Sequence, residues 1–296
     1  SLSSSDTPSE RPILIVDKEG VLGPLLLERF SAHHLTLYAS RQEPPVFPQT
    51  IYIPFRGKIP VIPDHSYSHL FVVYNGEKEL LKAVPSFLQK AKESGGTCVL
   101  LIPLFFFEDK ELTAYLARYS QLQIVIIGDM FGEKSFPHSP VQSLLNDAKL
   151  TGTAQLAESG LLPLYPVATE DVVEGIIAIG MGTPAPGMFA LFPKHPPTSL
   201  SFVRLLQRAY PLLGVTFTRH HEHNPTYHLP EDLIYVFTSS YPLEARLRKM
   251  DLRHTPLAST QHRKKRKIKS HKHSAPSRYR MVIISLLLFI ISSLIL

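Results

Sequence analysis

A strand, a glycine-containing turn and a helix follow one another near the amino terminus and restrict the possible folds more than any other segment. The apolar run 13–16 predicts a buried strand, and residues 24–30 predict a helix. Between them, Asp17, Gly20 and Gly23 keep the spacing of a G-x-x-G-x-x-G turn, with Asp17 in place of the first glycine. Such a turn lets a pyrophosphate approach bare backbone at a helix amino end. The chain therefore predicts a nucleotide-type fold, while the Asp17 carboxylate argues against the nucleotide.

Strand-like apolar runs and helix-period segments alternate along the first half of the chain. We expect strands at 13–16, 35–38, 51–54, 69–74, 98–104 and 123–127, and helices at 24–32, 77–93 and 109–119. Strands separated by helical crossovers indicate a parallel sheet. The fold class expected is therefore α/β, with a Rossmann-like doubly wound parallel sheet.

The second half predicts a smaller α/β part. We expect helices at 140–158, 167–180 and 199–210 and a strand at 188–192. The organisation expected is a flexible segment 1–11, a domain 12–254, a basic disordered linker 255–280 and a transmembrane segment 281–296. Within the domain, 12–132 would be the nucleotide-binding half and 133–254 the substrate-side half, interleaved with it.

The basic charge of the chain is concentrated in its carboxyl-terminal region. The formal net charge is +6, from 31 basic and 25 acidic residues, yet residues 263–280 hold nine basic and no acidic residues. Without them, 31 − 9 = 22 basic residues face 25 acidic ones, a net charge of −3. A folded nucleic-acid-binding domain would carry its positive charge across one face, so this function is not expected of residues 12–254.

The final residues, 281–296, are uncharged and apolar except for serines. As a helix they would extend about 24 Å, slightly less than the ~30 Å hydrocarbon core of a bilayer. The basic run 263–280 could be a nuclear-localisation or nucleic-acid patch, or a solvated tail. Its position before an apolar segment favours an anchor to anionic lipid headgroups, which would keep the domain in the cytoplasm.

Cysteine and histidine are two further residue types that could form a disulfide or bind a metal. The single cysteine, Cys98, lies in an apolar run and cannot form an internal disulfide, which fits a reducing compartment. His220, His221, His223 and His228 invite a metal interpretation, but they lack cysteine partners and lie in a loop-like segment, as do His262, His271 and His273. We therefore predict no metal site.

Several segments, taken in order, resemble the extended short-chain dehydrogenase/reductase family of NAD-dependent epimerases and dehydratases. They are the turn 16–23, the sequence Gly-Asp-Met-Phe-Gly at 128–132, the segment 165–176 with its Asp171-Val172 pair, and the helix 199–206. The resemblance covers roughly residues 11–250. It implies a Rossmann fold, an NAD or NADP cofactor and a nucleotide-sugar ligand.

The resemblance also assigns binding residues. The cofactor would contact Asp17, Gly20, Val21, Leu22 and Gly23 at the turn. A further candidate is Arg41, past the second strand, which could meet a 2′-phosphate and favour NADP, although a solvated loop arginine is the simpler interpretation. Asp129 and Met130 are the candidates for lining the pocket, because ligands bind at the carboxyl ends of parallel strands.

The catalytic pattern of the family is incomplete in this chain. The family uses Tyr-x-x-x-Lys on one helix, where the lysine lowers the pKa of the tyrosine that exchanges a proton with substrate. Here Lys110 occupies the lysine position and Phe106 the tyrosine position. Residues 102–105 offer no hydroxyl in place of the family's serine or threonine, and Ile126 replaces an arginine.

Three functions follow from these patterns. The first is a membrane-tethered, catalytically degenerate module that binds a nucleotide or a protein partner. The second is an active NAD(P)-dependent nucleotide-sugar epimerase, dehydratase or reductase with a divergent acid/base group. The third is a partner-binding domain that needs no ligand. Cofactor binding and turnover separate them.

Overall fold

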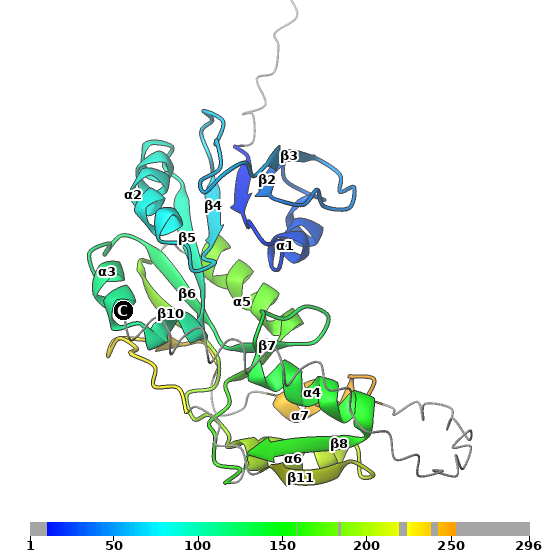
Figure 1. The fold of residues 1–296 in the computed structure, drawn as a ribbon. Helices are drawn as coiled ribbons and strands as arrows, with labels where there is room; N and C mark the ends of the chain where they lie inside the picture. Colours follow the sequence, from blue (N-terminus) through cyan, green and yellow to red (C-terminus); the bar gives the residue numbers. More distant parts are fainter. Residues whose placement is uncertain (1–10, 158, 183–184, 219–223, 238–241, 253–296) are drawn as a thin grey trace, which may run out of the picture. The chain divides into compact units, whose positions relative to one another are not determined.

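An eight-stranded parallel sheet forms the centre of the described chain (Figure 1). The structure is a computed structural model, and it describes residues 11–157, 159–182, 185–218, 224–237 and 242–252. The strand order is β12-β10-β6-β5-β4-β1-β2-β3. The strands are β1 (Ile13–Val16), β2 (Thr36–Ser40), β3 (Thr50–Pro54), β4 (His69–Val73), β5 (Thr97–Pro103), β6 (Gln123–Ile127), β10 (Gly187–Leu191) and β12 (Ile234–Tyr235).

The chain reverses its direction of winding at β1. It passes from β1 to β2 and β3 on one side, and then returns to add β4 on the other side. In register, Ile13 lies opposite Thr36 of β2 and His69 of β4. Connections leave β1 and β4 in opposite directions, which places a crevice at the carboxyl ends of these two strands. This crevice is where a doubly wound sheet binds its ligand.

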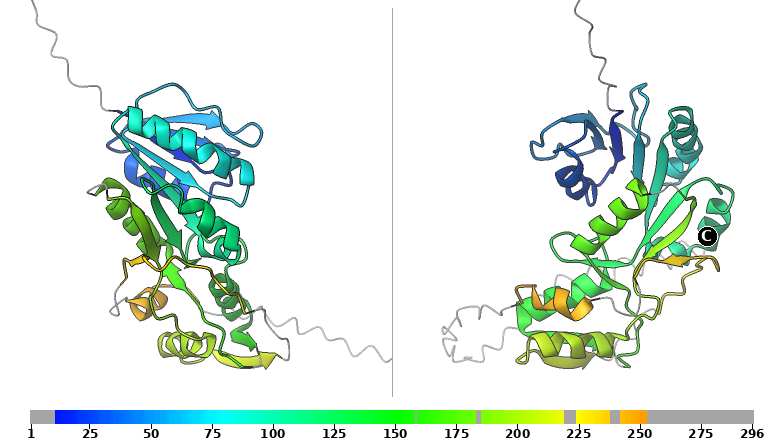
Figure 2. Two further views of the ribbon diagram at one scale, coloured as in Figure 1. Left: turned by 90° about the vertical axis from the view of Figure 1, so that its left-hand side faces the viewer. Right: turned by 180° about the vertical axis from the view of Figure 1, so that it is seen from behind.

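Helices cover both faces of the sheet (Figures 1 and 2). On one face, α1 (Gly23–Phe30) and α5 (Thr169–Met181) pack on alternate strand residues such as Ile13 and Ile15. On the other face, α2 (Lys78–Glu93), the 3₁₀ helix η1 (Leu104–Glu108) and α3 (Lys110–Leu116) pack on Leu14 and Val16. Because both faces are covered, the central strands are apolar at nearly every position, as the sequence predicted.

A smaller α/β part alternates along the chain with the sheet strands β10 and β12 and has its own core. It consists of α4 (Pro140–Thr151), β8 (Thr153–Ala157), α6 (Ser199–Ala209), β11 (Gly214–Thr218) and α7 (Leu243–Arg248). The parallel pair of β8 and β11 and the parallel pair of β7 (Asp129–Phe131) and β9 (Pro166–Ala168) lie outside the main sheet.

The expected α/β class and Rossmann-like parallel sheet are confirmed. The expected helix at 140–158 is wrong in its last part, because residues 153–157 form the strand β8. Gly152 has a φ of 70° and caps the end of α4, and the following residues pair with β11. Cys98 lies on β5 as expected, and burial raises the pKa of its thiol to about 12.

Two sequence predictions concern residues that lie mostly or wholly outside the described part. Among the described residues, no helix has the length and apolar character needed to span a bilayer, and segment 281–296 lies outside them. His220, His221 and His223 also lie outside the described residues. Within the described ranges, no three His, Cys, Asp or Glu side chains gather as a metal site.

Candidate functional site

The glycine turn lies at the carboxyl end of β1, beside the crevice, and its centre is the side chain of Asp17. This residue is 1% exposed. Its carboxylate accepts hydrogen bonds from the backbone N–H groups of Gly20 at 3.1 Å, Leu22 at 2.8 Å and Gly23 at 2.6 Å. These groups surround the amino end of α1, the place where a Rossmann-type turn presents its donors to phosphate. The Asp17 carboxylate thus binds the donors itself.

Two opposing effects act on the acidity of Asp17. Burial raises the pKa of this carboxyl above its ordinary value. The N–H groups of Gly23, Leu22 and Gly20 favour the ionised form and offset part of that rise. The net pKa is raised, so the site holds a carboxyl whose ionised form depends on the hydrogen bonds of the turn.

Tyr38 on β2 explains why the turn keeps its glycines. Its side chain is 1% exposed and lies against the start of α1. A Cβ atom on Gly23 would lie 2.3 Å from Tyr38 Cε2, and one on Gly20 would lie 3.5 Å from the Tyr38 hydroxyl. Gly20 also has a φ of 70°, which favours glycine. The tyrosine therefore accounts for Gly23, and the left-handed backbone accounts for Gly20, without any ligand.

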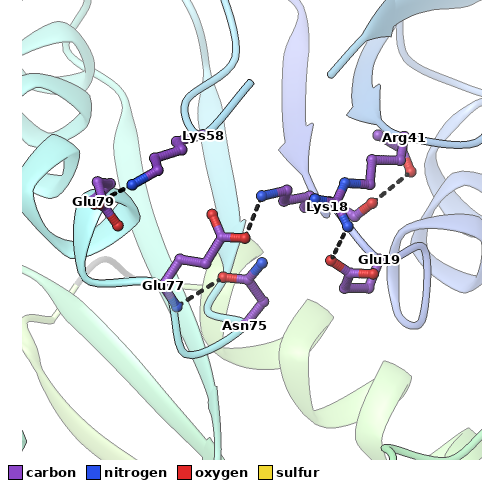
Figure 3. A network of polar contacts seen from close by, with 8 residues as sticks. Lys18, Glu19, Arg41, Lys58, Asn75, Glu77 and Glu79 are labelled. Atoms are coloured by element: carbon purple, nitrogen blue, oxygen red, sulfur yellow. Dashed lines mark hydrogen bonds and ion pairs between the residues drawn. The ribbon is translucent and has the colours of Figure 1, made fainter. Parts of the chain in front are cut away.

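The crevice itself is crossed by an ion pair. Figure 3 shows Lys18, from the β1 turn, directed at Glu77, which precedes α2. Lys18 is 2% exposed, and its amino group also lies 5.3 Å from the centroid of the Phe55 ring. The backbone N–H of Glu77 donates to Asn75 Oδ1 at 3.2 Å. The pair joins the loops that follow β1 and β4, the two strands on either side of the crevice.

The other predicted cofactor residues lie near this turn. Leu22 is buried in the core under α1, and Val21 packs against the same core. Arg41 pairs with Glu19 at 3.2 Å, and both side chains are about half exposed (Figure 3). The structure thus brings all the predicted cofactor residues together.

The predicted catalytic pair does not share a helix. Phe106 belongs to η1, Lys110 begins α3, and Asp109 between them is extended, with φ −81° and ψ 110°. The family pattern places both residues on one helix, whereas here they belong to two different helices. Asp109 ends the 3₁₀ segment and caps α3 by accepting the N–H of Glu111 at 2.9 Å.

The ring of Phe106 packs within the protein, whereas Lys110 is exposed. The ring centroids of Phe106 and Tyr74 lie 4.8 Å apart. A Cβ atom on Gly76 would lie 2.7 Å from Phe106 Cε1. Phe106 also lines a cavity of about 490 Å³ between α2 and α3, together with Leu81 and Tyr115.

Asp129 lies just beyond the carboxyl end of β6 and is 8% exposed. Its carboxylate accepts the N–H of Tyr165 at 2.8 Å, and its own N–H donates to the carbonyl of Tyr165 at 2.6 Å. Burial raises the pKa of Asp129 to about 6, although the Tyr165 N–H favours the ionised form. Its neighbour Met130 is fully buried in the core.

Sequence reasoning missed the residues that come from distant segments. Tyr227 packs on Tyr165 with ring centroids 5.3 Å apart, and the N–H of His228 donates to the Phe107 carbonyl at 2.8 Å. Burial raises the pKa of Tyr227, and the charge of nearby Asp129 adds to the rise. No local motif marks these contacts. Tyr38 and Lys18, by contrast, adjoin predicted strands and could have been noticed.

No protein-family model matches the chain, and no curated protein matches it in sequence. Solved structures are similar in fold. ADP-L-glycero-D-manno-heptose-6-epimerase of Helicobacter pylori aligns with a TM-score of 0.58 at 13% identity, covering 81% of this chain and 94% of that one. The dTDP-glucose 4,6-dehydratase of Bacillus anthracis, solved in complex with NAD, gives 0.54 at 11% identity, covering 80% and 95%.

A third similar structure is UDP-glucuronic acid 4-epimerase of Bacillus cereus, solved in complex with UDP-glucuronic acid and NAD. It aligns with a TM-score of 0.53 at 9% identity, covering 80% of this chain and 96% of that one. At such identities the likeness establishes the fold. The chain shares its Rossmann-like architecture with these two epimerases and this dehydratase.

The residues at the turn do not fit the dinucleotide that this fold implies. A pyrophosphate needs free N–H donors at the start of α1, and three of them already donate to Asp17. A phosphate brought beside this carboxyl would meet a like charge whenever the carboxyl is ionised.

Proposed function

We propose that the chain is a catalytically degenerate module of short-chain dehydrogenase/reductase type, which acts by binding rather than by turnover. The observation that supports this most directly is the separation of Phe106 and Lys110 into different helices. Proton exchange by the family's Tyr-x-x-x-Lys pattern would use a hydroxyl at position 106 and a cation close to it. The chain has a phenyl ring there, and Lys110 is exposed.

A second candidate is an active NAD(P)-dependent nucleotide-sugar epimerase, dehydratase or reductase. The fold favours it, because the similar solved structures include enzymes of this kind. Asp129 favours it too, since a carboxyl whose pKa is raised to about 6 exchanges protons readily near neutral pH. In this alternative Asp129 would replace the missing tyrosine as the acid/base group.

A turnover assay separates the two candidates. The full chain would be incubated with UDP-glucose, UDP-glucuronic acid or dTDP-glucose, with and without NAD and NADP, and the products analysed by chromatography. We expect no conversion by the wild type or by Asp129→Asn. Conversion by the wild type that is lost in Asp129→Asn, and kept in the exposed-site control Asp232→Asn, would contradict degeneracy and establish the second candidate.

We also propose that residues 263–296 tether the module to the cytoplasmic face of a membrane. The nine basic residues and the apolar segment after them support this, through attraction to anionic headgroups and burial in hydrocarbon. The full chain should float with lipid vesicles in a density gradient, even at high salt. A chain that stays in the soluble fraction with both neutral and anionic vesicles would refute the tether.

A further inference from the structure

We infer that the crevice between β1 and β4 is closed by the protein's own side chains, with the Asp17 side chain accepting the N–H groups of the turn in place of a ligand phosphate. The inference concerns the cofactor side of the site on which the proposed function rests. It narrows that function, because a nucleotide-binding role would need this crevice. It does not depend on Phe106, so an experiment can refute the closed crevice without refuting the proposed loss of catalysis.

The backbone N–H donors of the turn are already occupied by Asp17. The two carboxylate oxygens of Asp17 take the N–H groups of three residues within 3.1 Å. A carboxylate at this position also has a favourable interaction with the partial positive charge of the α1 amino end. An anion from solution would find these donors occupied. It would have to displace a group that is covalently held and therefore present at a very high effective concentration.

The protein's own side chains also fill the space around the turn. Tyr38 approaches the turn from β2 so closely that even a methyl group on Gly23 would overlap its ring. Lys18 extends from β1 to Glu77 at the start of α2 and is almost completely buried. The loops after β1 and β4 thus each contribute a charged side chain that occupies the crevice (Figure 3).

The buried ion pair in the crevice also connects two parts of the fold. The Lys18–Glu77 pair links the loops after β1 and β4, which begin the two oppositely wound halves of the sheet. Breaking this pair would leave Lys18 buried without a counter-ion, which is strongly unfavourable. The turn that binds cofactor in a typical Rossmann sheet therefore serves here to hold the two halves together.

An anion-rescue experiment tests the inference on the full chain. Asp17→Ala should lower the melting temperature, because the three N–H groups lose their acceptor in a buried site. Millimolar pyrophosphate, the probe, should then raise the melting temperature of Asp17→Ala by several degrees, because it can fill the emptied donor site. The wild type should show no such rise. Glu19→Ala is the matched control: it removes the same charge two residues away at a half-exposed position and should show neither effect.

Titration of the wild type with NADH and NADPH, followed by calorimetry and by cofactor fluorescence, completes the test. We expect no binding at millimolar cofactor. Binding by the wild type would overturn the inference, and so would an Asp17→Ala variant as stable as Glu19→Ala. If Asp17→Ala does not fold, the titration of the wild type with cofactor still shows whether the crevice is closed. Cofactor binding without turnover would overturn the closed crevice and leave the proposed catalytic degeneracy standing, whereas turnover would refute both.

Discussion

Two buried carboxyl groups, Asp17 and Asp129, lie at the carboxyl edge of the sheet in different surroundings. Asp17 accepts hydrogen bonds from three backbone N–H groups. Asp129 is held by the single N–H of Tyr165 and lies near the rings of Tyr165 and Tyr227. Burial raises the pKa of both carboxyl groups, that of Asp129 to about 6, and the backbone N–H groups that donate to each carboxylate offset part of the rise.

The raised pKa of Asp129 predicts a pH-dependent stability. Between about pH 4 and pH 6 the folded state holds this proton and the unfolded state does not, so the free energy of unfolding falls as pH rises through this window. This rise of the pKa to about 6 corresponds to roughly 3 kcal/mol. Asp129→Asn, with a neutral amide, should lose this dependence. Urea unfolding from pH 4 to pH 7 measures it.

The matched control for this prediction is Asp232→Asn, which changes an exposed carboxyl. Its stability should follow the wild type across the whole range. If Asp129→Asn also follows the wild type at every pH, the carboxyl of Asp129 titrates normally. Its burial would then not govern its ionisation.

At the residue scale, the sequence revealed which positions depart from the expected pattern but not what the departures do. Asp17 stood out because a carboxyl replaces a glycine in a recognisable turn. Whether it would project into the phosphate position or away from it depends on the path of six residues, which no spacing rule fixes. Tyr227 could not be found at all, because its contact with Tyr165 joins segments that are distant in sequence.

At the scale of elements, α5 illustrates how small residues set the distance between a helix and the sheet. Gly180 faces the ring of Phe71 on β4, and a Cβ atom there would lie 2.6 Å from Phe71 Cε1. Phe71 is fully buried and stacks on Phe30 of α1 at 5.3 Å between centroids. The ring is therefore enclosed between α1 and α5 and cannot move aside freely.

Gly180→Ala should consequently destabilise the protein, although alanine favours helix. The gain in helix propensity is up to about 1 kcal/mol, whereas overpacking a filled core costs about 1–3 kcal/mol. We expect a net loss of about 1 kcal/mol in urea unfolding. Ala178→Gly, at an exposed position of the same helix, measures the propensity contribution alone. An equal and opposite gain in Gly180→Ala would show that the packing at Phe71 is loose.

The sequence predicted the elements of the main sheet well, because strands covered on both faces form continuous apolar runs. It failed where elements are short or where polar and apolar residues mix. Residues 153–157 continued the pattern of a helix, and only the left-handed Gly152 and the pairing with β11 make them a strand. The three-residue strands β7 and β9 are too short to show any periodicity.

At the scale of the whole molecule, the crevice has changed its role while the architecture has stayed the same. The parallel sheet still reverses its winding between β1 and β4, the place where ligands bind in such folds. In this protein the place is occupied by Asp17, Tyr38 and the Lys18–Glu77 pair. A fold that holds NAD in two of the similar solved structures here carries a turn that is complete without a ligand.

Amide hydrogen exchange at Gly20, Leu22 and Gly23 tests this central claim most directly, because these N–H groups are the ones that a bound phosphate would otherwise protect. We expect them to exchange slowly in the ligand-free wild type, to remain unchanged on addition of millimolar NADH, and to exchange faster in Asp17→Ala. Fast exchange in the ligand-free protein that slows when NADH is added would contradict the account and restore the turn as a cofactor site.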